Sequence, residues 1–332
     1  MQHIQDNIYR IPVPLPNNPL RELNAYLIRG ERDLLIDTGF DLDACEKIII
    51  NSLAELNIKR DKLDIFITHF HSDHVGLLHR LVTPKTRVWC GKIPWDILAV
   101  EDPNRWQKRF QALRSFGLCQ IDEQWNPQNK PEFSVNWSKV KNFSVVKEGQ
   151  VIEVGGLRLK CIETDGHFPG HICLYEPKLK ILFAGDHILD KISPNVACYN
   201  LDNSSSLAQY LQSLDKVAKM DIKLVLPGHR NFLTDVQRRV TELKIHHQER
   251  LAEVERIITH KGQTGVEIAS QMKWDLSYPA WEKFPPTQKF FALGEAMAHI
   301  NYLVEKGSIR VVNRCGILYF SKVVKKINTE YF

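Results

Sequence analysis

The chain has 332 residues, of which 43% are hydrophobic and 25% are charged, and its formal net charge is +5 at pH 7. These proportions are those of an ordinary soluble globular protein, and the length allows one large domain with an appendage or two domains. No apolar run approaches the ~18 residues of a membrane helix, and the N-terminus carries no signal-peptide pattern, so we expect no membrane association. The seven scattered cysteines include no C-x-x-C pair, which favours a reducing cytoplasm.

Short apolar runs predict three strands at the start of the chain, at 8–11, 25–28 and 33–36. A helix should follow from Leu42, because apolar residues then recur at helical spacing. The same spacing predicts another helix over 207–218. Helices that cover sheets are typical of a layered α/β fold.

The string HFHSDH at 69–74 is the most informative segment of the chain. It places three imidazoles and a carboxylate in six positions, directly after the apolar run at 64–67. Neutral imidazole and carboxylate are the ligands preferred by zinc and its neighbours in the transition series. The string therefore predicts a metal site at the end of a strand.

Residues 93 to about 147 interrupt the strand and helix pattern and contain four tryptophans, at 95, 106, 125 and 137. We interpret these rings as packing anchors of a helical insertion, and an aromatic wall above an active site remains the alternative. In either case the insertion is expected to border a substrate cleft.

Three later segments repeat one arrangement, in which a short aliphatic run is followed by a Gly or Pro and then by a metal-ligand side chain. They are GHFPGH at 166–171, GDH at 185–187 and PGH at 227–229. Ligands that follow strand ends collect along one edge of a sheet, where loops converge on a rigid scaffold. The four segments therefore predict one shared site.

The last hundred residues predict a separate domain. A long amphipathic helix should begin near 235, with His247 on its apolar stripe as a core histidine. A short helix at 264–272 and a longer one at 288–305 follow, and strands at 309–312 and 316–320 make a hairpin. This order is that of a winged helix, and we expect domain boundaries at 1–235 and 236–332. The whole net charge of +5 lies within 238–332, which is weak support for contact with nucleic acid.

Over roughly the first 235 residues the motifs resemble those of the metallo-β-lactamase superfamily, with LIDTG at 35–39 as the opening element. The resemblance implies a four-layer αββα sandwich, here with a C-terminal winged-helix-like α+β domain. It implies two divalent metal ions, most simply zinc, because position 71 is His and not the Glu of the flavodiiron branch. Iron and manganese remain alternatives. The ligands carried over are His69, His71 and His167 for one ion, Asp73, His74 and His229 for the second, and Asp186 as the bridge.

The implied chemistry is hydrolysis by a hydroxide shared between the two ions, with Asp73 as a catalytic residue that orients it or passes a proton. Asp37 is expected to orient the ligand loop through hydrogen bonds and not to bind metal. His171 is expected to orient a ligand or face the substrate, with a plain structural role equally open. His187 is expected to be structural.

The tail resembles a superfamily branch that includes the β-lactamase-like protein 2 group, through the string ALGEAMAHINYL at 292–303. Our first prediction is a hydrolase of an ester, thioester or lactone, similar to the glyoxalase II-like branch, although the tail departs from the glutathione-gripping domain of true glyoxalase II. The alternative is a metal-dependent endoribonuclease or phosphodiesterase acting on single-stranded RNA. A metal-responsive DNA-binding regulator is the third reading. The expected partners are a small-molecule substrate, single-stranded RNA under the alternative, no membrane, and a second subunit in a homodimer.

Overall fold

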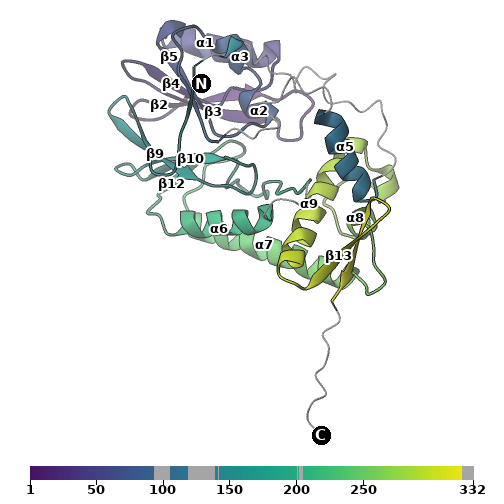
Figure 1. Cartoon of the computed structure of the whole chain (residues 1–332). Helices are drawn as coiled ribbons and strands as arrows, with labels where there is room; N and C mark the ends of the chain where they lie inside the picture. The colour runs from purple at the N-terminus through teal and green to yellow at the C-terminus, as the bar shows by residue number, and fades with distance from the viewer. Residues whose placement is uncertain (93–104, 119–138, 141, 200, 202–204, 324–332) are drawn as a thin grey trace. The chain divides into compact units, whose positions relative to one another are not determined.

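The computed structural model describes residues 1–92, 105–118, 139–140, 142–199, 201 and 205–323 (Figure 1). The chain divides into two compact units. One unit comprises residues 1–102, 126–194 and 210–242, and the other comprises 103–125, 195–209 and 243–332. None of the helices among the described residues is long and apolar enough to span a membrane.

Seven strands form the first sheet of the first unit, in the order of the chain. Strands β1 to β4 pair antiparallel, while β4 to β7 pair parallel. The strands are β1 (Gln2–Gln5), β2 (Ile8–Pro14), β3 (Glu22–Ile28), β4 (Asp33–Ile36), β5 (Leu63–Ile67), β6 (Val88–Cys90) and β7 (Phe143–Val145). The predicted strands at 8–11, 25–28 and 33–36 are confirmed within β2, β3 and β4.

Five strands form the second sheet, in the order β12-β11-β10-β9-β8. Its pairs are antiparallel except β11 with β12, which is parallel. The strands are β8 (Val151–Val154), β9 (Leu157–Glu163), β10 (Ile172–Glu176), β11 (Ile181–Gly185) and β12 (Leu224–Pro227).

The two sheets pack face to face through one apolar core. Tyr26 and Phe66 of the first sheet share this core with Phe183 and Leu226 of the second, and the Tyr26 and Phe183 rings meet edge to face with centroids 5.4 Å apart. A second core lies on the other face of the first sheet, under α1 (Asp43–Glu55). Since β4 and β5 are covered on both faces, every residue in them is buried.

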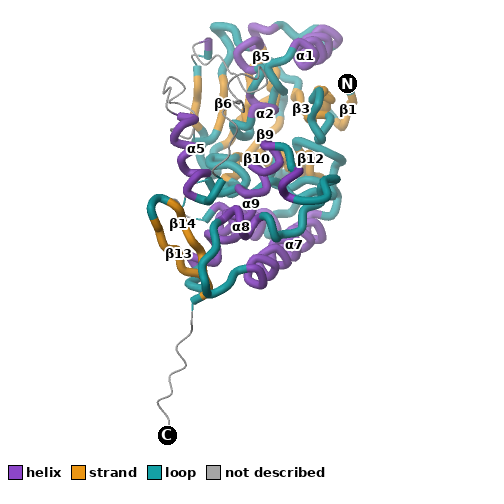
Figure 2. The backbone as a smooth tube through the Cα atoms, turned by 90° about the vertical axis from the view of Figure 1, so that its right-hand side faces the viewer, coloured by secondary structure: helices purple, strands orange, loops and turns teal. Residues whose placement is uncertain are grey.

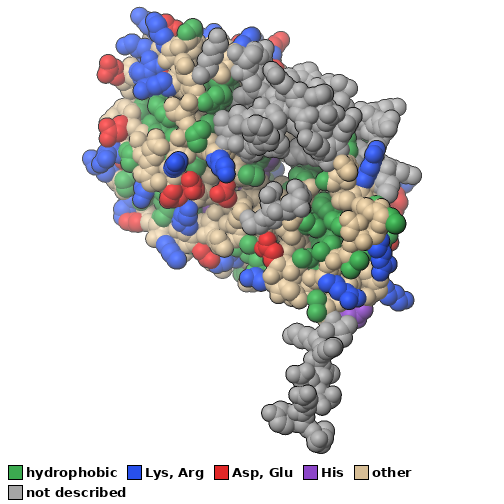
Figure 3. Space-filling view, in the orientation of Figure 1, with side chains coloured by type: hydrophobic (Ala, Val, Ile, Leu, Met, Phe, Trp, Pro, Cys, Tyr) green, Lys and Arg blue, Asp and Glu red, His purple; other side chains and the backbone are tan. Residues whose placement is uncertain are grey.

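Helices cover the outer faces of both sheets (Figure 1). The short helices α2 (Ser72–Val75) and α3 (Leu78–Leu81) join α1 beside the first sheet, and α6 (Ser206–Ala218) lies along the second. The layers of this unit therefore run helix, sheet, sheet, helix, which is the expected αββα sandwich. On the face drawn in Figure 3, acidic and basic side chains are interspersed over this unit.

Part of the predicted insertion falls within α5 (Arg105–Ser115), which contains position 106. Trp95, Trp125 and Trp137 lie outside the described residues, so the predicted role of these rings remains a prediction. In α5, Leu113 is buried, and Phe110, three positions earlier in the helix, is half-buried.

The described part of the last hundred residues has the predicted element order of three helices and a hairpin. Figure 2 labels these elements. These elements are α7 (Val236–Ile257), α8 (Gly265–Ala269), α9 (Pro286–Glu305), β13 (Ile309–Arg314) and β14 (Ile317–Lys322). Thr264 and Glu267 form the expected reciprocal cap at the start of α8. His247 is buried and hydrogen-bonded to His299 at 3.1 Å, which is the core position predicted for it.

Candidate metal centre

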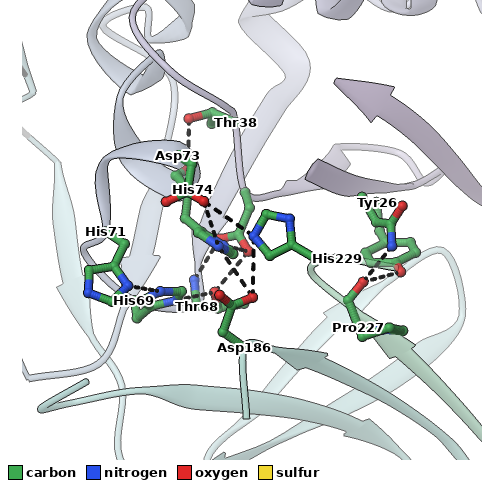
Figure 4. A network of polar contacts seen from close by, with 12 residues as sticks. Tyr26, Thr38, Thr68, His69, His71, Asp73, His74, Asp186, Pro227 and His229 are labelled. Carbon is green, nitrogen blue, oxygen red and sulfur yellow. Dashed lines mark hydrogen bonds and ion pairs between the residues drawn. The ribbon is translucent and has the colours of Figure 1, made fainter. Parts of the chain in front are cut away.

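The predicted ligands stand just beyond four strand ends of the first unit (Figure 4). The string at 69–74 leaves the end of β5 and turns into α2, which carries Asp73 and His74. His167 lies in the loop between β9 and β10, Asp186 directly follows β11, and His229 lies just beyond β12. Strand ends that share one edge of the sandwich thus bring together side chains that are up to 160 positions apart, from His69 to His229.

Three imidazole nitrogens form a close triangle at one side of this cluster. His69 Nε2 lies 3.0 Å from His71 Nδ1. His167 Nε2 lies 3.3 Å from His69 Nε2 and 3.0 Å from His71 Nδ1. Nitrogens that bind one tetrahedral zinc ion at ~2.0–2.1 Å lie about 3.3 Å apart. The triangle therefore has the dimensions of a single-ion site.

Asp73, His74 and His229 form a second group, and their ligand atoms lie within 4.8 Å of one another. Asp73 Oδ2 is 3.2 Å from His229 Nε2 and 3.9 Å from His74 Nε2. Asp73 and His74 are adjacent in the first turn of α2, and that turn directs both side chains toward His229.

Asp186 stands between the two groups and turns one oxygen toward each. Its Oδ1 lies 3.5 Å from His74 Nε2 and 3.6 Å from His229 Nε2. Its Oδ2 lies 3.7 Å from His167 Nε2. This is the arrangement expected of a carboxylate that bridges two cations (Figure 4).

Three buried polar atoms in the cluster test whether the donor set fits cations. His74 Nε2, Asp186 Oδ1 and His229 Nε2 make no hydrogen bond of proper geometry among the described residues, although they lie 3.2–3.6 Å from other polar atoms of the cluster, and all three face the same space. A buried polar atom without a partner costs about 1–3 kcal/mol. A cation among these atoms would supply the missing partner, so the residues present fit a metal ion.

The protonation of the cluster also suits a cation. Burial, with the neighbouring imidazoles, lowers the pKa of His69 well below its usual range and that of His71 to about 3. Burial opposes the charge on His74, yet the carboxylates of Asp186, Asp37 and Asp73 outweigh it and raise the pKa of His74 well above its usual range. Neutral imidazole is the metal-binding form. The carboxylates around His74 therefore favour a positive charge at this place, which a cation on the neutral Nε2 would supply instead of a proton.

Asp37 contacts the cluster from behind, as an orienting carboxylate would. Its Oδ2 accepts from His74 Nδ1 at 2.8 Å, and its Oδ1 accepts from the Thr68 backbone N–H at 2.9 Å. With its Nδ1 proton held by Asp37, His74 directs the Nε2 lone pair toward the other ligands. Asp37 itself has a left-handed backbone, with φ 61°, at the end of β4.

His171 holds the backbone of Asp186, the residue predicted to bridge the two ions. Its Nε2 accepts from the Asp186 N–H at 3.2 Å, and its Nδ1 lies 2.8 Å from Thr164 Oγ1. The imidazole is fully buried, so this geometry favours the orienting role over the substrate-facing one. His187 is also fully buried and packs edge to face on Tyr210, with ring centroids 5.5 Å apart.

Residues of β3 support His229, and the sequence pattern did not single them out. His229 Nδ1 lies 2.8 Å from the Glu22 carbonyl oxygen. The Pro227 carbonyl accepts from Asn24 Nδ2 at 2.9 Å and from Tyr26 Oη at 2.7 Å. The available signal was Asn24, a buried polar residue between the apolar residues Leu23 and Ala25 of β3.

Gly228 is required by the close approach of the ligands. A Cβ atom at this position would lie 2.6 Å from Asp186 Oδ1 and 2.9 Å from His74 Cε1. No side chain fits between the end of β12 and the Asp186 carboxylate, which explains the glycine before His229.

Comparison with known families agrees with this geometry. The family described as "Metallo-beta-lactamase superfamily" matches residues 19–229, which is more than half of the chain. The family described as "Metallo-beta-lactamase-like, C-terminal domain" matches residues 251–323. The chain therefore belongs to the metallo-β-lactamase superfamily and carries the C-terminal domain of one of its branches.

Several named proteins are similar to most of this chain. The "Probable metallo-hydrolase YqjP" of Bacillus subtilis is 24% identical over 96% of this chain and 97% of its own length. The "Beta-lactamase-like protein 2 homolog" of Caenorhabditis elegans is 23% identical over 83% of this chain and 79% of its own. The human "Acyl-coenzyme A thioesterase MBLAC2" is 27% identical over 63% of this chain and 73% of its own.

Among solved structures, the metallo-beta-lactamase family protein TTHA1429 from Thermus thermophilus is similar throughout. It has a TM-score of 0.81 and 26% identity, and the match covers 96% of this chain and 99% of that one. Together with the hydrolase names of the relatives, this places the chain among the superfamily's metal-binding hydrolases.

Proposed function

We propose that the chain is a hydrolase that binds two divalent cations and cleaves a thioester, within the wider class of esters, thioesters and lactones. The observation that carries this proposal is the position of Asp186, whose two carboxylate oxygens face two separate groups of ligands. A carboxylate in that position suits a pair of ions better than a single ion.

The two groups described above are the proposed ligand sets, with Asp186 shared between them. Zinc is the proposed metal, because five of the seven donors are imidazoles, and iron or manganese would accept the same set. When bound, such a pair supplies a water of lowered pKa and polarises the carbonyl oxygen of the substrate.

Asp73 is the residue proposed to move a proton. Burial opposes its charge, but His74 and His229 outweigh this and lower the pKa of Asp73 to about 2. The carboxylate is therefore ionised at neutral pH, which is the state a proton acceptor must be in before it takes a proton from the attacking water. Water adds to the thioester carbonyl, the C–S bond breaks, and the thiol departs with a proton while the acyl group leaves as a carboxylic acid.

The thioester is preferred among the carbonyl substrates because of one relative's name. The human relative is named an acyl-coenzyme A thioesterase, and its match includes 63% of this chain. An endoribonuclease or phosphodiesterase built on the same centre is the alternative, and it has no comparable support in the names of the relatives described above. The hypothesis of a metal-responsive DNA-binding regulator that no longer catalyses comes third, because every ligand predicted for catalysis is present in the cluster.

We also propose that residues 1–235 form the catalytic domain and 236–332 a winged-helix-like domain. The element order α7, α8, α9, β13, β14 supports the second assignment. A cytoplasmic location remains part of the proposal. It suits the six described cysteines, which are free thiols, five of them buried.

A substrate panel tests the proposed function. The protein is freed of metal, reloaded with zinc or manganese, and incubated with acyl-coenzyme A, a lactone, bis-p-nitrophenyl phosphate and single-stranded RNA. His69→Ala serves as the blank. Hydrolysis of the thioester by the loaded wild type alone supports the proposal, whereas activity restricted to RNA and the phosphodiester favours the alternative.

A further inference from the structure

Helix α6 touches two of the loops that carry the proposed ligands, and Tyr210 makes the first contact. The side chain is fully buried. Its hydroxyl donates to the His187 carbonyl oxygen at 2.9 Å, and its ring packs edge to face on the His187 imidazole. His187 directly follows the bridging Asp186. Tyr210 therefore fixes the loop that sets the position of that carboxylate.

The backbone of the same residue closes on the other loop. Gly166, at φ +133°, lies so near α6 that a Cβ atom there would be 2.4 Å from both Cα and Cβ of Tyr210. No L-side chain fits this gap or favours this backbone conformation. Gly166 directly precedes His167, so the position of this ligand is set by direct contact with the helix.

Ser213, one turn further along α6, binds the same loop. Its Oγ donates to the Asp165 carbonyl oxygen at 2.8 Å. The Asp165 carboxylate in turn accepts from the Gly170 N–H at 2.5 Å, which closes the loop around His167. Two side chains on one helical face thus reach the residues beside two different ligands.

We propose that α6 is a positioning element of the metal centre, in which Tyr210 and Ser213 hold Asp186 and His167 at the separation that two cations require. This inference rests on the proposed ligand set. The physical reason is that the Tyr210 hydroxyl is buried, so no water replaces its bond when the hydroxyl is removed, and the His187 carbonyl loses its partner. The loop of the bridging residue then shifts, and metal centres tolerate such shifts poorly.

The test uses Tyr210→Phe, which keeps the ring and removes only the hydroxyl, and Ser213→Ala, which removes only the bond to the 165–170 loop. Tyr175→Phe is the matched control. Tyr175, in β10 of the second sheet, also donates its Oη to a backbone carbonyl, that of Asp221 at 2.7 Å, but this bond is exposed to solvent. The full-length proteins are freed of metal and titrated with Co²⁺, and both the affinity and the visible absorption spectrum are recorded.

We expect Tyr210→Phe and Ser213→Ala each to weaken at least one of the two Co²⁺ binding steps by about tenfold or more and to change the visible spectrum. Tyr175→Phe should match the wild type in both measurements. A role in stability alone would lower the melting temperature of the metal-free protein without changing the spectrum of the loaded one, and that result overturns the proposal. If Tyr210→Phe does not fold, Ser213→Ala decides by the same criteria. A wild type that binds fewer than two ions refutes the proposed function itself.

Discussion

Asp37 and His74 form a buried hydrogen bond of 2.8 Å between a carboxylate oxygen and an imidazole Nδ1, with side chains only 3% and 0% exposed. The bond links the end of β4 to the first turn of α2. It directs the remaining imidazole nitrogen toward Asp186 and His229. The outer carboxylate thus determines which nitrogen of His74 faces the proposed metal.

Replacing Asp37 with Asn should weaken cation binding while the fold survives. Both carboxylate oxygens of Asp37 accept hydrogen bonds from Thr68 and His74. The amide of Asn has only one acceptor oxygen, so at least one of these bonds is lost. We expect metal affinity to fall about 10- to 100-fold, measured by competition with a chromophoric chelator. Asp33→Asn is the control, because Asp33 is a buried carboxylate at the start of β4, the strand that Asp37 follows, and it pairs with Arg29 and not with the cluster. Equal losses in both variants would contradict the assigned role of Asp37.

Replacing Asp73 with Asn separates proton transfer from metal binding. The amide keeps an oxygen for the second ligand group but cannot accept a proton. We expect kcat to fall about 10²- to 10⁴-fold while much of the metal content, measured by plasma mass spectrometry, remains. Full turnover with both ions bound would show that Asp73 moves no proton.

Metal removal should destabilise the protein, because ions that bind only the folded state stabilise it by mass action. At a free ion concentration about 100 times Kd this amounts to roughly 2.7 kcal/mol. We expect a chelator to lower the melting temperature of the wild type and excess zinc to restore it. The response should be much smaller in His69→Ala, and an equal response there would mean that the stabilising ions bind elsewhere.

The ligand motifs could be predicted because each is a short contiguous string after an apolar run, as at 69–74. The supports around the ligands could not. Asn24 and Pro227, for example, are joined by a hydrogen bond across 203 positions, and no local periodicity records such a pairing. Tyr210 falls within the helix predicted over 207–218, but nothing in that pattern indicated that its hydroxyl binds the loop beside Asp186.

The short strands β1, β7 and β8 were not predicted, because each has only three or four residues, too few to establish an alternation. β7 has three residues, of which two are exposed. β1 is polar and exposed at its start, as an edge strand of the sheet often is. Such strands form because a neighbouring strand offers its backbone groups, and that neighbour is not visible in the local sequence.

The buried pair His247 and His299 predicts how stability depends on pH. Burial and the neighbouring His299 lower the pKa of His247 to about 2, and burial lowers that of His299 to about 4. Both pKa values lie below the ~6.5 of an unfolded histidine. Between each of these pKa values and about pH 6.5, the unfolded chain therefore binds more protons than the folded protein. The contribution of these two neutral histidines to the free energy of unfolding is therefore complete above about pH 6.5 and is lost as the pH falls.

We expect the free energy of unfolding of the metal-free protein to fall by up to about 1 kcal/mol per pH unit for each of these histidines below pH 6.5, measured by urea denaturation at pH 7, 6 and 5. His247→Leu should remove part of this dependence, because one of the two proton-excluding groups is gone. His260→Gln changes an exposed histidine and should keep the wild-type dependence. If His247→Leu shows the same slope as the wild type, the pair is not a source of the acid sensitivity.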